Sequence, residues 1–248
     1  MLSHLLMTSE FDYSAIETGY YDRIYRSRKG IQSKWHWLKF RHIAELLAAR
    51  GALGKDKRLL DLACGPGTFI GSLDSEVDAV GVDIAQPQVD YAQSQYATAH
   101  KRFVRIDGGR LPFDDGVFDA VTIIELIEHL TMQQNLELLI EARRVLKPST
   151  GVLIVSTPNY HSGWPVLEAM VNRVAEVSYA EQHITRFHRR RLASLLGQAG
   201  LREIEVRRYQ GFAPFGALLS WTFSDWLYRV ERLPSRLHGF LLVATATK

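Results

Sequence analysis

The stretch LLDLACGPGTF, residues 59–69, constrains the fold of this chain more than any other part of it. An apolar run typical of a buried strand leads into a turn with Gly65 and Gly67, and the pattern of a short helix follows. Glycine permits a tight turn and lets a ligand approach the backbone closely. The start of the helix offers free N–H groups that bind a carboxylate or a phosphate. The stretch therefore predicts an α/β fold with a ligand at the turn.

Short apolar runs alternate with helical patterns along the following residues, as expected for a mostly parallel sheet that is covered on both faces. The expected strands are residues 58–63, 78–83, 102–107, 118–124, 151–157, 201–209 and 239–247. The expected helices between them include residues 86–100, a helix from about 131 to 146, and 189–199. Thr131 followed by Gln134 is a capping-box pattern, which predicts where the second of these helices begins.

The regions outside this alternation are less regular. Residues 11–50 carry apolar side chains at helical spacing, residues 164–177 contain a helical piece, and residues 211–236 are aromatic-rich and irregular. A chain of 248 residues can bury one sizeable core. We expect a single domain over residues 1–248, with N-terminal lid helices (1–54), a ligand-binding core (55–160), and substrate-side elements with the closing strands (161–248).

Three of the expected strands carry an aspartate at or near their carboxyl end: Asp61, Asp83 and Asp107. The carboxyl ends of parallel strands meet at one edge, where open α/β sheets bind ligands. Asp83 follows Asp61 by 22 residues, the place from which an acid bonds the ribose hydroxyls of a nucleoside ligand. A dinucleotide dehydrogenase would need a third glycine at position 70, which is isoleucine here.

Four stretches in this order resemble the class I S-adenosylmethionine-dependent methyltransferases, in particular the O-methyltransferases of ubiquinone biosynthesis. They are LLDLACGPGTF, VGVDIAQPQVDYAQ, IDGGRLPFDDGVFDAV and LKPSTGVLIVSTPN. The resemblance implies a three-layer, Rossmann-like, seven-stranded sheet that ends in an antiparallel hairpin, with a helical insertion before the last strand. It also implies S-adenosyl-L-methionine as the cofactor.

The resemblance further implies which residues contact that cofactor. Asp83 would bind the ribose, with Ile84 against the adenine, while Asp107 would bond the adenine amino group and Gly108 would lie beside the ring. Glu125 would also touch the cofactor, after the fourth strand. The methionine part would be held by the first strand and its turn: Asp61, Ala63, Cys64, Gly65 and Gly67.

The stretch ELIEHL, residues 125–130, has three interpretations. In the first, Glu125, Glu128 and His129 bind a divalent metal, with His183 as a later ligand, as in similar RNA methyltransferases. In the second, His129 is the general base for an oxygen nucleophile, because its ordinary pKa suits that task. In the third, Glu125 touches the cofactor or the lid, Glu128 stabilises a helix start, and His129 packs. The third interpretation is favoured and the metal least, so no metal is expected.

We expect methyl transfer to an oxygen atom of a small-molecule acceptor, with His129 as the leading base and His161 and His183 as alternatives. Two other classes stay open: a metal-dependent RNA or catechol-type enzyme, and a binding protein without catalysis. The N-terminal helices would form the lid, with Tyr20, Tyr21, Tyr25, His36 and Trp37 as its functional side chains and Trp35 in the core.

The composition of the chain limits the kinds of partner that we expect it to bind. The formal net charge of +3 is spread along the chain, so we expect no nucleic acid partner. The single cysteine excludes an internal disulfide, and neither a signal peptide nor a membrane-spanning stretch is recognisable. We therefore expect a cytoplasmic protein. We expect it to be a monomer or a homodimer. In residues 211–236, Asp225 and Glu231 offset the charges of Arg229 and Arg232. This offset favours a cover for an apolar substrate or a dimer face over a membrane surface.

Overall fold

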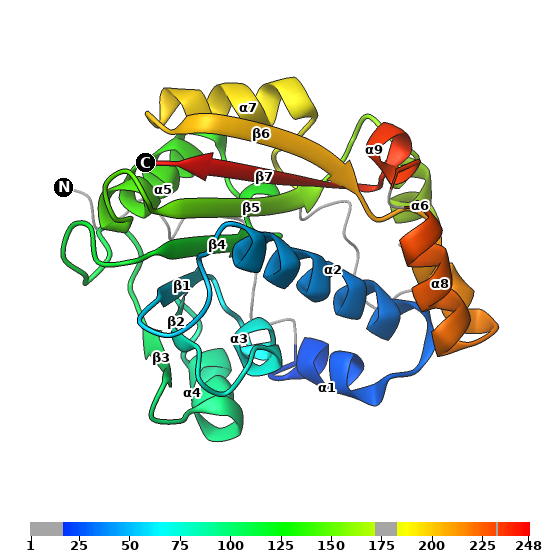
Figure 1. The fold of residues 1–248 in the computed structure, drawn as a ribbon, viewed down its shortest axis with the longest axis horizontal. Helices are drawn as coiled ribbons and strands as arrows, with labels where there is room; N and C mark the ends of the chain where they lie inside the picture. Colours follow the sequence, from blue (N-terminus) through cyan, green and yellow to red (C-terminus); the bar gives the residue numbers. More distant parts are fainter. Residues whose placement is uncertain (1–16, 172–182, 232) are drawn as a thin grey trace.

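The computed structural model describes residues 17–171, 183–231 and 233–248, and its strands form one seven-stranded sheet (Figure 1). The strands are Arg58–Leu62 (β1), Asp78–Asp83 (β2), Lys101–Arg105 (β3), Ala120–Ile124 (β4), Val152–Pro158 (β5), Arg202–Tyr209 (β6) and Leu241–Thr247 (β7). Their order across the sheet is β3-β2-β1-β4-β5-β7-β6. β7 runs antiparallel to β5 and β6, whereas the other pairs are parallel. The predicted Rossmann-like sheet with a closing antiparallel hairpin is confirmed.

Helices cover both faces of the sheet. The longer ones are Tyr20–Ser27 (α1), Gly30–Ala49 (α2), Gln86–Tyr96 (α4), Met132–Val145 (α5), Trp164–Val171 (α6), Arg189–Gln198 (α7) and Trp221–Glu231 (α8). The short ones are Thr68–Ser72 (α3), Ser235–His238 (α9), and the 3₁₀ turns Ile127–His129 (η2) and Ala213–Leu218 (η3). Figure 1 shows α2 crossing one face of the sheet, with α8 and α9 at the flank where its N-terminal end lies.

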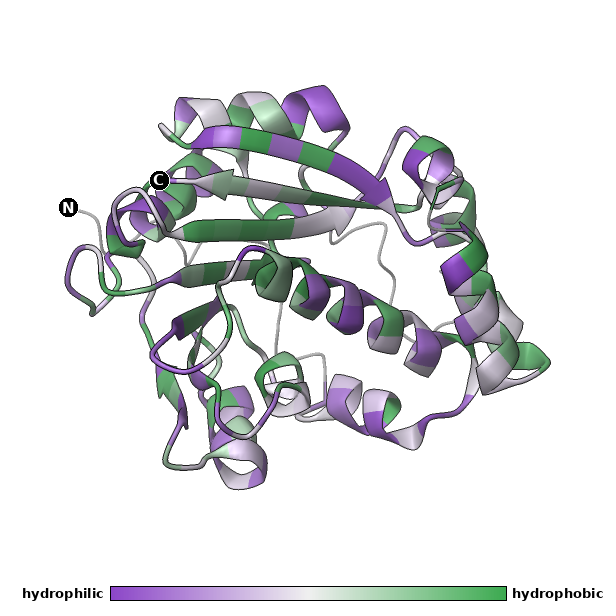
Figure 2. Cartoon of the chain, in the orientation of Figure 1, coloured by the Kyte–Doolittle hydropathy of each residue, from purple (hydrophilic) through white to green (hydrophobic). Residues whose placement is uncertain are grey.

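Alternating strand residues supply two hydrophobic cores, one on each face, because side chains along a strand point to opposite sides. Leu60 and Ile123 join α5 and α7 in one core, whereas Leu59 and Ile154 join α2, α3 and α4 in the other. Most of β5 is accordingly coloured as hydrophobic in Figure 2, up to its last residues. Sheets buried on both faces have this near-continuous apolar texture.

Several expected boundaries were wrong by a few residues. β3 ends at Arg105 because its neighbour β2 ends opposite it at Asp83, so Asp107 lies beyond the strand. α4 ends at Tyr96 instead of residue 100, because the Thr98 hydroxyl accepts N–H groups of the next turn. β4 begins at Ala120, two residues late. The capping box at Thr131 is confirmed, with both of its hydrogen bonds present.

Two larger expectations were also inaccurate. The helical stretch 11–50 is divided after α1, where Arg28 has a left-handed backbone; its first six residues lie outside the described part of the chain. Residues 211–236 are not irregular but contain η3, α8 and the start of α9. Glu231 holds this insertion together by accepting the backbone N–H groups of residues 211–213. Of the expected helical piece 164–177, α6 is described and residues 172–177 are not.

Candidate active site

The carboxyl ends of β1, β2 and β4 bring the predicted site residues to one edge of the sheet. β1 lies between β2 and β4, in parallel register with Leu62 opposite both Val82 and Ile123. The turns that leave these strands, residues 63–67 and 125–129, therefore begin side by side. The order of the strands reverses between β1 and β4, and open α/β sheets bind ligands at such a switch point.

Asp83 ties the glycine turn to the end of β2. Its Oδ2 accepts the N–H of Gly65 at 2.8 Å, and its Oδ1 accepts the N–H of Ala85 at 2.9 Å. Burial raises the pKa of this carboxyl, and the backbone donors oppose that effect. A carboxylate has about four lone-pair directions, so two remain for the hydroxyls of a ligand. The position suits the ribose contact that the sequence predicts.

The two glycines of the turn have different surroundings. Both have a positive φ, +51° at Gly65 and +75° at Gly67. A Cβ on Gly67 would lie 2.7 Å from a ring atom of Phe103 and 2.8 Å from the Cβ of Ala92. A Cβ on Gly65 would meet no atom of the described residues within 4 Å. Gly67 is therefore needed for packing, whereas Gly65 borders space that a ligand can enter.

Asp61 and Cys64 are buried beside the turn. The hydroxyl of Thr122 donates to Asp61 Oδ1 at 2.6 Å, and burial raises the pKa of Asp61 to about 7. Burial also raises the pKa of the Cys64 thiol well above its usual range. A buried thiol of this kind is a packing residue and not a nucleophile.

The expected adenine contacts lie further along the same edge. Ile84 follows β2 and is 38% exposed, which leaves an apolar side chain available for a planar ring. Asp107 is exposed and pairs with Arg105 at 2.6 Å, and Gly108 turns the chain directly after it. The structure therefore places these three residues at the edge, with Asp107 the most exposed of them.

Two residues without glycine's freedom have left-handed backbones at this edge. Ala63 follows β1 with φ +57°, and Glu125 follows β4 with φ +52°. Such a conformation costs about 1–2 kcal/mol for an ordinary residue. Strained backbone of this kind clusters at functional sites, and here it occurs on the two adjacent strands that flank the switch point.

Glu125 pairs with Lys39, which was not among the predicted site residues. The Nζ of Lys39 contacts Glu125 Oε2, and the lysine side chain is only 3% exposed. Lys39 comes from α2, so the ion pair fastens the expected lid helix to the end of β4. If α2 packed elsewhere, the charge of Lys39 or Glu125 would lose its partner at a free-energy cost, so the ion pair favours this packing of α2.

Asp22 on α1 is a second anchor that the sequence analysis missed. It is fully buried and accepts hydrogen bonds from Thr68 at 3.0 Å and Tyr91 at 2.9 Å, and also from Tyr96. These partners belong to α3 and α4. Asp22 therefore holds the first lid helix against the helix that leaves the glycine turn.

The expected lid aromatics pack along α1 and α2. Tyr25 stacks on Trp37 with ring centroids 5.7 Å apart, and Trp35 packs into the core as predicted. Tyr25, Trp37 and Phe40 line a cavity of ≈ 1160 Å³ between α2 and the α3–β2 connection. None of the edge residues lines this cavity, which therefore lies apart from the glycine turn and the acids.

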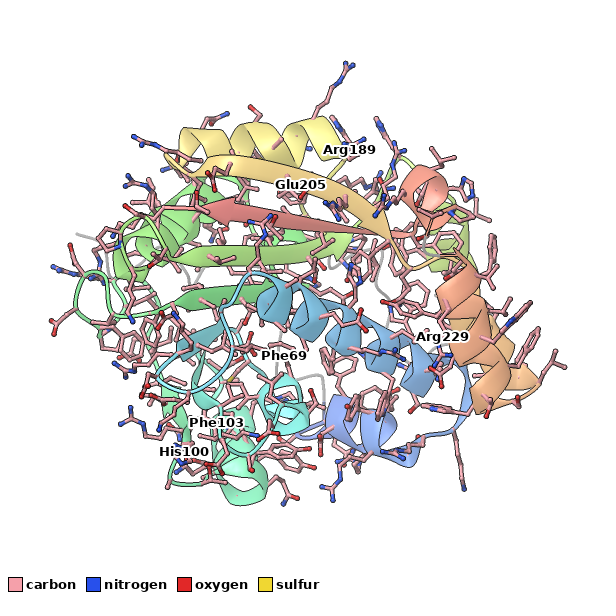
Figure 3. The ribbon with its side chains drawn as sticks, in the orientation of Figure 1. Phe69, His100, Phe103, Arg189, Glu205 and Arg229 are labelled. Carbon is pink, nitrogen blue, oxygen red and sulfur yellow. The ribbon has the colours of Figure 1, made fainter. Side chains whose placement is uncertain are left out.

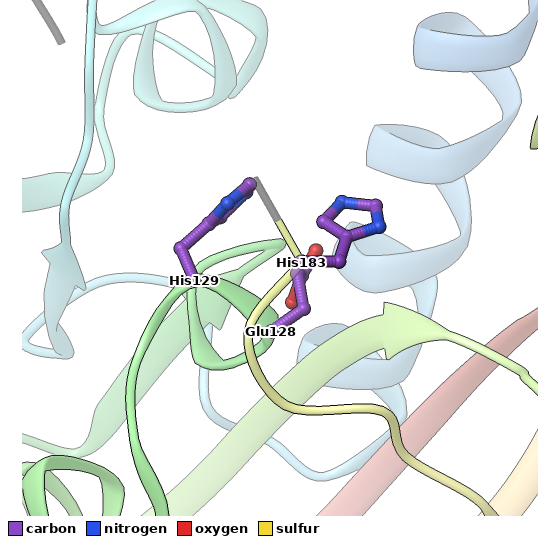
Figure 4. Close-up of side chains that lie close together, drawn as sticks. All are labelled: Glu128, His129 and His183. Atoms are coloured by element: carbon purple, nitrogen blue, oxygen red, sulfur yellow. The ribbon is translucent and has the colours of Figure 1, made fainter. Parts of the chain in front are cut away.

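Glu128 and His129 of η2 converge with His183 (Figure 4). One ligand atom from each lies within 4.8 Å of the others, and the two imidazole centroids are 5.1 Å apart. Glu128 and His183 are buried, and His129 is half-buried. Glu128 lies in the first turn of η2, near a helix start as the third interpretation has it, and its side chain is buried. The expected alternative base His161 instead stacks on His188.

A further set of polar side chains surrounds this cluster. The Thr157 hydroxyl donates to Glu128 Oε2 at 2.9 Å. His183 Nδ1 lies 2.5 Å from Glu168 Oε1 and 2.6 Å from the Tyr160 hydroxyl. Burial raises the pKa of Glu128 to about 8 and lowers that of His183, and Glu168 opposes the latter change. These contacts fix the imidazole of His183, as carboxylates do for histidines in acid–base and metal sites.

Comparisons with known proteins agree with this geometry. A family model described as a methyltransferase domain matches residues 59–149. The demethylmenaquinone methyltransferase of Beutenbergia cavernae is 31% identical over 171 residues, which are 62% of this chain and 70% of that protein. The same enzyme of Lactiplantibacillus plantarum is 28% identical over 200 residues, which are 71% and 82% of the two chains. The match to an uncharacterized protein of a Streptomyces fradiae transposon, 34% identical, spans only 30% of that protein.

The fold is also similar to solved structures. A crystal structure of a SAM-dependent methyltransferase from Archaeoglobus fulgidus superimposes with a TM-score of 0.57 at 20% identity. The match covers 83% of this chain and 92% of that one. Within the described residues, no helix is long and apolar enough to cross a membrane.

Proposed function

The chain belongs to the class I S-adenosylmethionine-dependent methyltransferases, and we propose that it methylates an oxygen atom of a small, apolar acceptor. When bound, the cofactor supplies an activated methyl group. The protein's contribution is then to position the acceptor, exclude water and remove a proton. The observation that carries the proposal is the convergence of Glu128, His129 and His183 at the sheet edge that also holds the glycine turn.

The cofactor fits this edge. The open space at Gly65 receives the methionine part, and the buried carboxylate of Asp61 faces its ammonium group. The remaining lone pairs of Asp83 accept the ribose hydroxyls, and Ile84 covers the adenine. Asp107 and Gly108 complete the adenine side of the site. Ala63, Cys64 and Gly67 shape the turn, mainly through packing.

The lid is held over this edge by charges from α1 and α2. Asp22 bonds the helix after the glycine turn, and Lys39 neutralises Glu125 at the end of β4. Both groups are buried, so water is excluded from the side of the site that they close. Water exclusion strengthens the electrostatic interactions that orient the acceptor.

His129 is the base in this proposal. It is half-buried beside Glu128 and His183, so its imidazole can reach an acceptor hydroxyl while the other two remain enclosed. As the base, this imidazole takes up the proton of the hydroxyl while the oxygen attacks the methyl group. The apolar acceptor is supported by the demethylmenaquinone methyltransferases among the relatives, and the oxygen atom by an O-methyltransferase of Aspergillus nomiae.

The test compares His129→Gln with His161→Gln. General-base catalysis is worth about 10²- to 10⁴-fold, so the first change should lower kcat by that factor and leave the cofactor Kd unchanged. His161 stacks on His188 away from the cluster, so the second change should leave both quantities near their wild-type values. Wild-type kcat in His129→Gln, with a naphthoquinol and a catechol among the acceptors, would remove His129 from the mechanism.

A second candidate function is a metal-dependent O-methyltransferase, which the close approach of Glu128, His129 and His183 favours. A carboxylate and two imidazoles suit Mn²⁺ or Zn²⁺, and such an ion would acidify an acceptor hydroxyl. Under this alternative, dialysis against a chelator abolishes turnover and added Mn²⁺ or Zn²⁺ restores it. Under the base mechanism, chelator leaves kcat unchanged.

A further inference from the structure

The connection between β6 and β7 exposes an unusual number of apolar side chains. Of the twelve exposed large apolar residues in the described part of the chain, seven lie here. We call them the apolar flank: Phe212, Leu218, Leu219, Trp226, Val230, Leu233 and Leu237, which are between 54% and 79% exposed. Single exposed apolar residues are ordinary, whereas a concentration of them on one insertion marks an interaction surface.

The elements that carry the apolar flank pack closely against the rest of the protein. η3 and α8 pack on each other, and Tyr228 on the inner side of α8 bonds His42 of α2 at 3.0 Å. The indole of Trp221 lies 4.2 Å from the Nζ of Lys34, a fully buried lysine of α2. Trp226 and Val230 are four residues apart and share the outer face of α8. Their exposure therefore belongs to a well-packed helix that turns its apolar side outward.

The acids of this region are directed inward, contrary to what its sequence suggests. Asp225 pairs with Lys34 at 2.9 Å, and Glu231 accepts three backbone N–H groups of the insertion. Arg229, labelled on α8 in Figure 3, and Arg236 on α9 are exposed. The acids thus do not offset these arginines at the surface, because both carboxylates are already engaged.

The nearest loop adds charge of the same sign. Arg28 lies 5.0 Å above the ring of Trp37, and Trp37 contacts Trp221 edge to face at 6.3 Å. These contacts place the α1–α2 loop, with exposed Arg28 and Lys29, next to the start of α8. Figures 1 and 2 show α8 and α9 along one side of the molecule, with apolar residues at the tip before α8.

We propose that the apolar flank docks on an anionic lipid surface. Apolar side chains bordered by cations, with the acids withdrawn, form the combination that binds at the interface of such a bilayer. A second copy of the chain fits less well, because a two-fold contact through this surface would bring Arg229 and Arg236 toward the same residues of its partner. Docking of this kind attaches the protein to the bilayer surface without inserting a helix. The proposal depends on the apolar flank alone and not on the identity of the methyl acceptor.

Vesicle co-sedimentation of the full chain tests this proposal. The vesicles contain phosphatidylcholine alone or phosphatidylcholine with phosphatidylglycerol at a ratio of about three to one. We expect binding to the anionic vesicles and at least tenfold weaker binding to the neutral ones. Leu218→Ser/Leu219→Ser should weaken anionic binding at least tenfold, whereas Ile140→Ser, an exposed apolar residue of α5, should not.

A second pair of variants tests the charges. Each cation near an anionic surface contributes about fivefold to partitioning, so Arg229→Gln/Arg236→Gln should weaken binding by about twenty- to thirtyfold. Arg190→Gln/Arg202→Gln removes two exposed arginines elsewhere and should change it less than threefold. Circular dichroism verifies that each variant is folded.

Three results would overturn the proposal. One is no binding of the wild-type chain to anionic vesicles, and another is equal binding to neutral ones. The third is a wild-type dimer in solution that Leu218→Ser/Leu219→Ser converts to a monomer, because the apolar flank would then be a contact between two copies.

Discussion

Replacing Gly67 and Gly65 individually with alanine should separate folding from ligand binding within the glycine turn. Both positions have a positive φ, so either alanine strains the backbone by about 1–2 kcal/mol. Only at Gly67 does the new methyl group overlap neighbours, 2.7 Å from a ring atom of Phe103 and 2.8 Å from the Cβ of Ala92. Overpacking of that kind costs about 1–3 kcal/mol more.

The free energy of unfolding should therefore fall by about 2–5 kcal/mol in Gly67→Ala and by about 1–2 kcal/mol in Gly65→Ala. Cofactor affinity should change in the opposite order. Gly65→Ala places a methyl group in the space that we propose for the ligand, so we expect at least tenfold weaker binding. Gly67→Ala should bind within a fewfold of wild type at temperatures where it is folded.

Urea denaturation followed by circular dichroism measures the stabilities, and calorimetric titration with S-adenosylhomocysteine measures the affinities. Gly51→Ala is the matched control, because Gly51 has φ +62° with no described atom within 4 Å of an added Cβ, at the far end of α2. It should show the backbone cost alone. Equal losses of stability in Gly65→Ala and Gly67→Ala, or wild-type affinity in Gly65→Ala, would refute this reasoning.

Two further predictions concern the charged residues of the edge. Glu128 has a pKa of about 8 in the folded chain and near 4.5 when unfolded. Between these two pH values, Glu128 is protonated in the folded state and ionised in the unfolded state. The free energy of unfolding therefore falls by up to about 1.4 kcal/mol per pH unit as the pH rises from 5 to 8. Denaturation of Glu128→Gln at several pH values should lack this part of the slope; an unchanged slope contradicts it. Lys39→Met should lower the free energy of unfolding by about 2 kcal/mol, and adding Glu125→Gln should recover about half of this loss, because the two charges are coupled. Strictly additive effects of the two changes on stability would show that they are not coupled.

Much of the sheet could be predicted because its signals are local. The apolar runs, the turn at Gly65 and the capping box at Thr131 each depend on residues close together in the sequence. The parallel order also follows from the alternation of strands and helices. For the same reason Asp61 and Asp83 could be expected at one edge before any coordinates were known.

The residues that the sequence did not reveal act across long separations. Lys39 and Asp22 look like ordinary charges on amphipathic helices, and only the packing of α1 and α2 brings them to Glu125 and Thr68. The prediction that Asp225 offsets the nearby arginines was wrong for the same reason, because Asp225 pairs with Lys34, almost two hundred residues earlier. Charge counts along a segment cannot show which way a side chain turns.

The most direct test of the account is calorimetric binding of S-adenosylhomocysteine to the wild-type chain, Asp83→Ala and Asp83→Asn. The carboxylate of Asp83 is expected to make two charge-assisted hydrogen bonds to the ribose, each worth about 1.5–3 kcal/mol. We predict one site in the wild type and at least hundredfold weaker binding in both folded variants. No measurable binding to the wild type, or wild-type affinity in Asp83→Asn, would contradict a cofactor site at this edge.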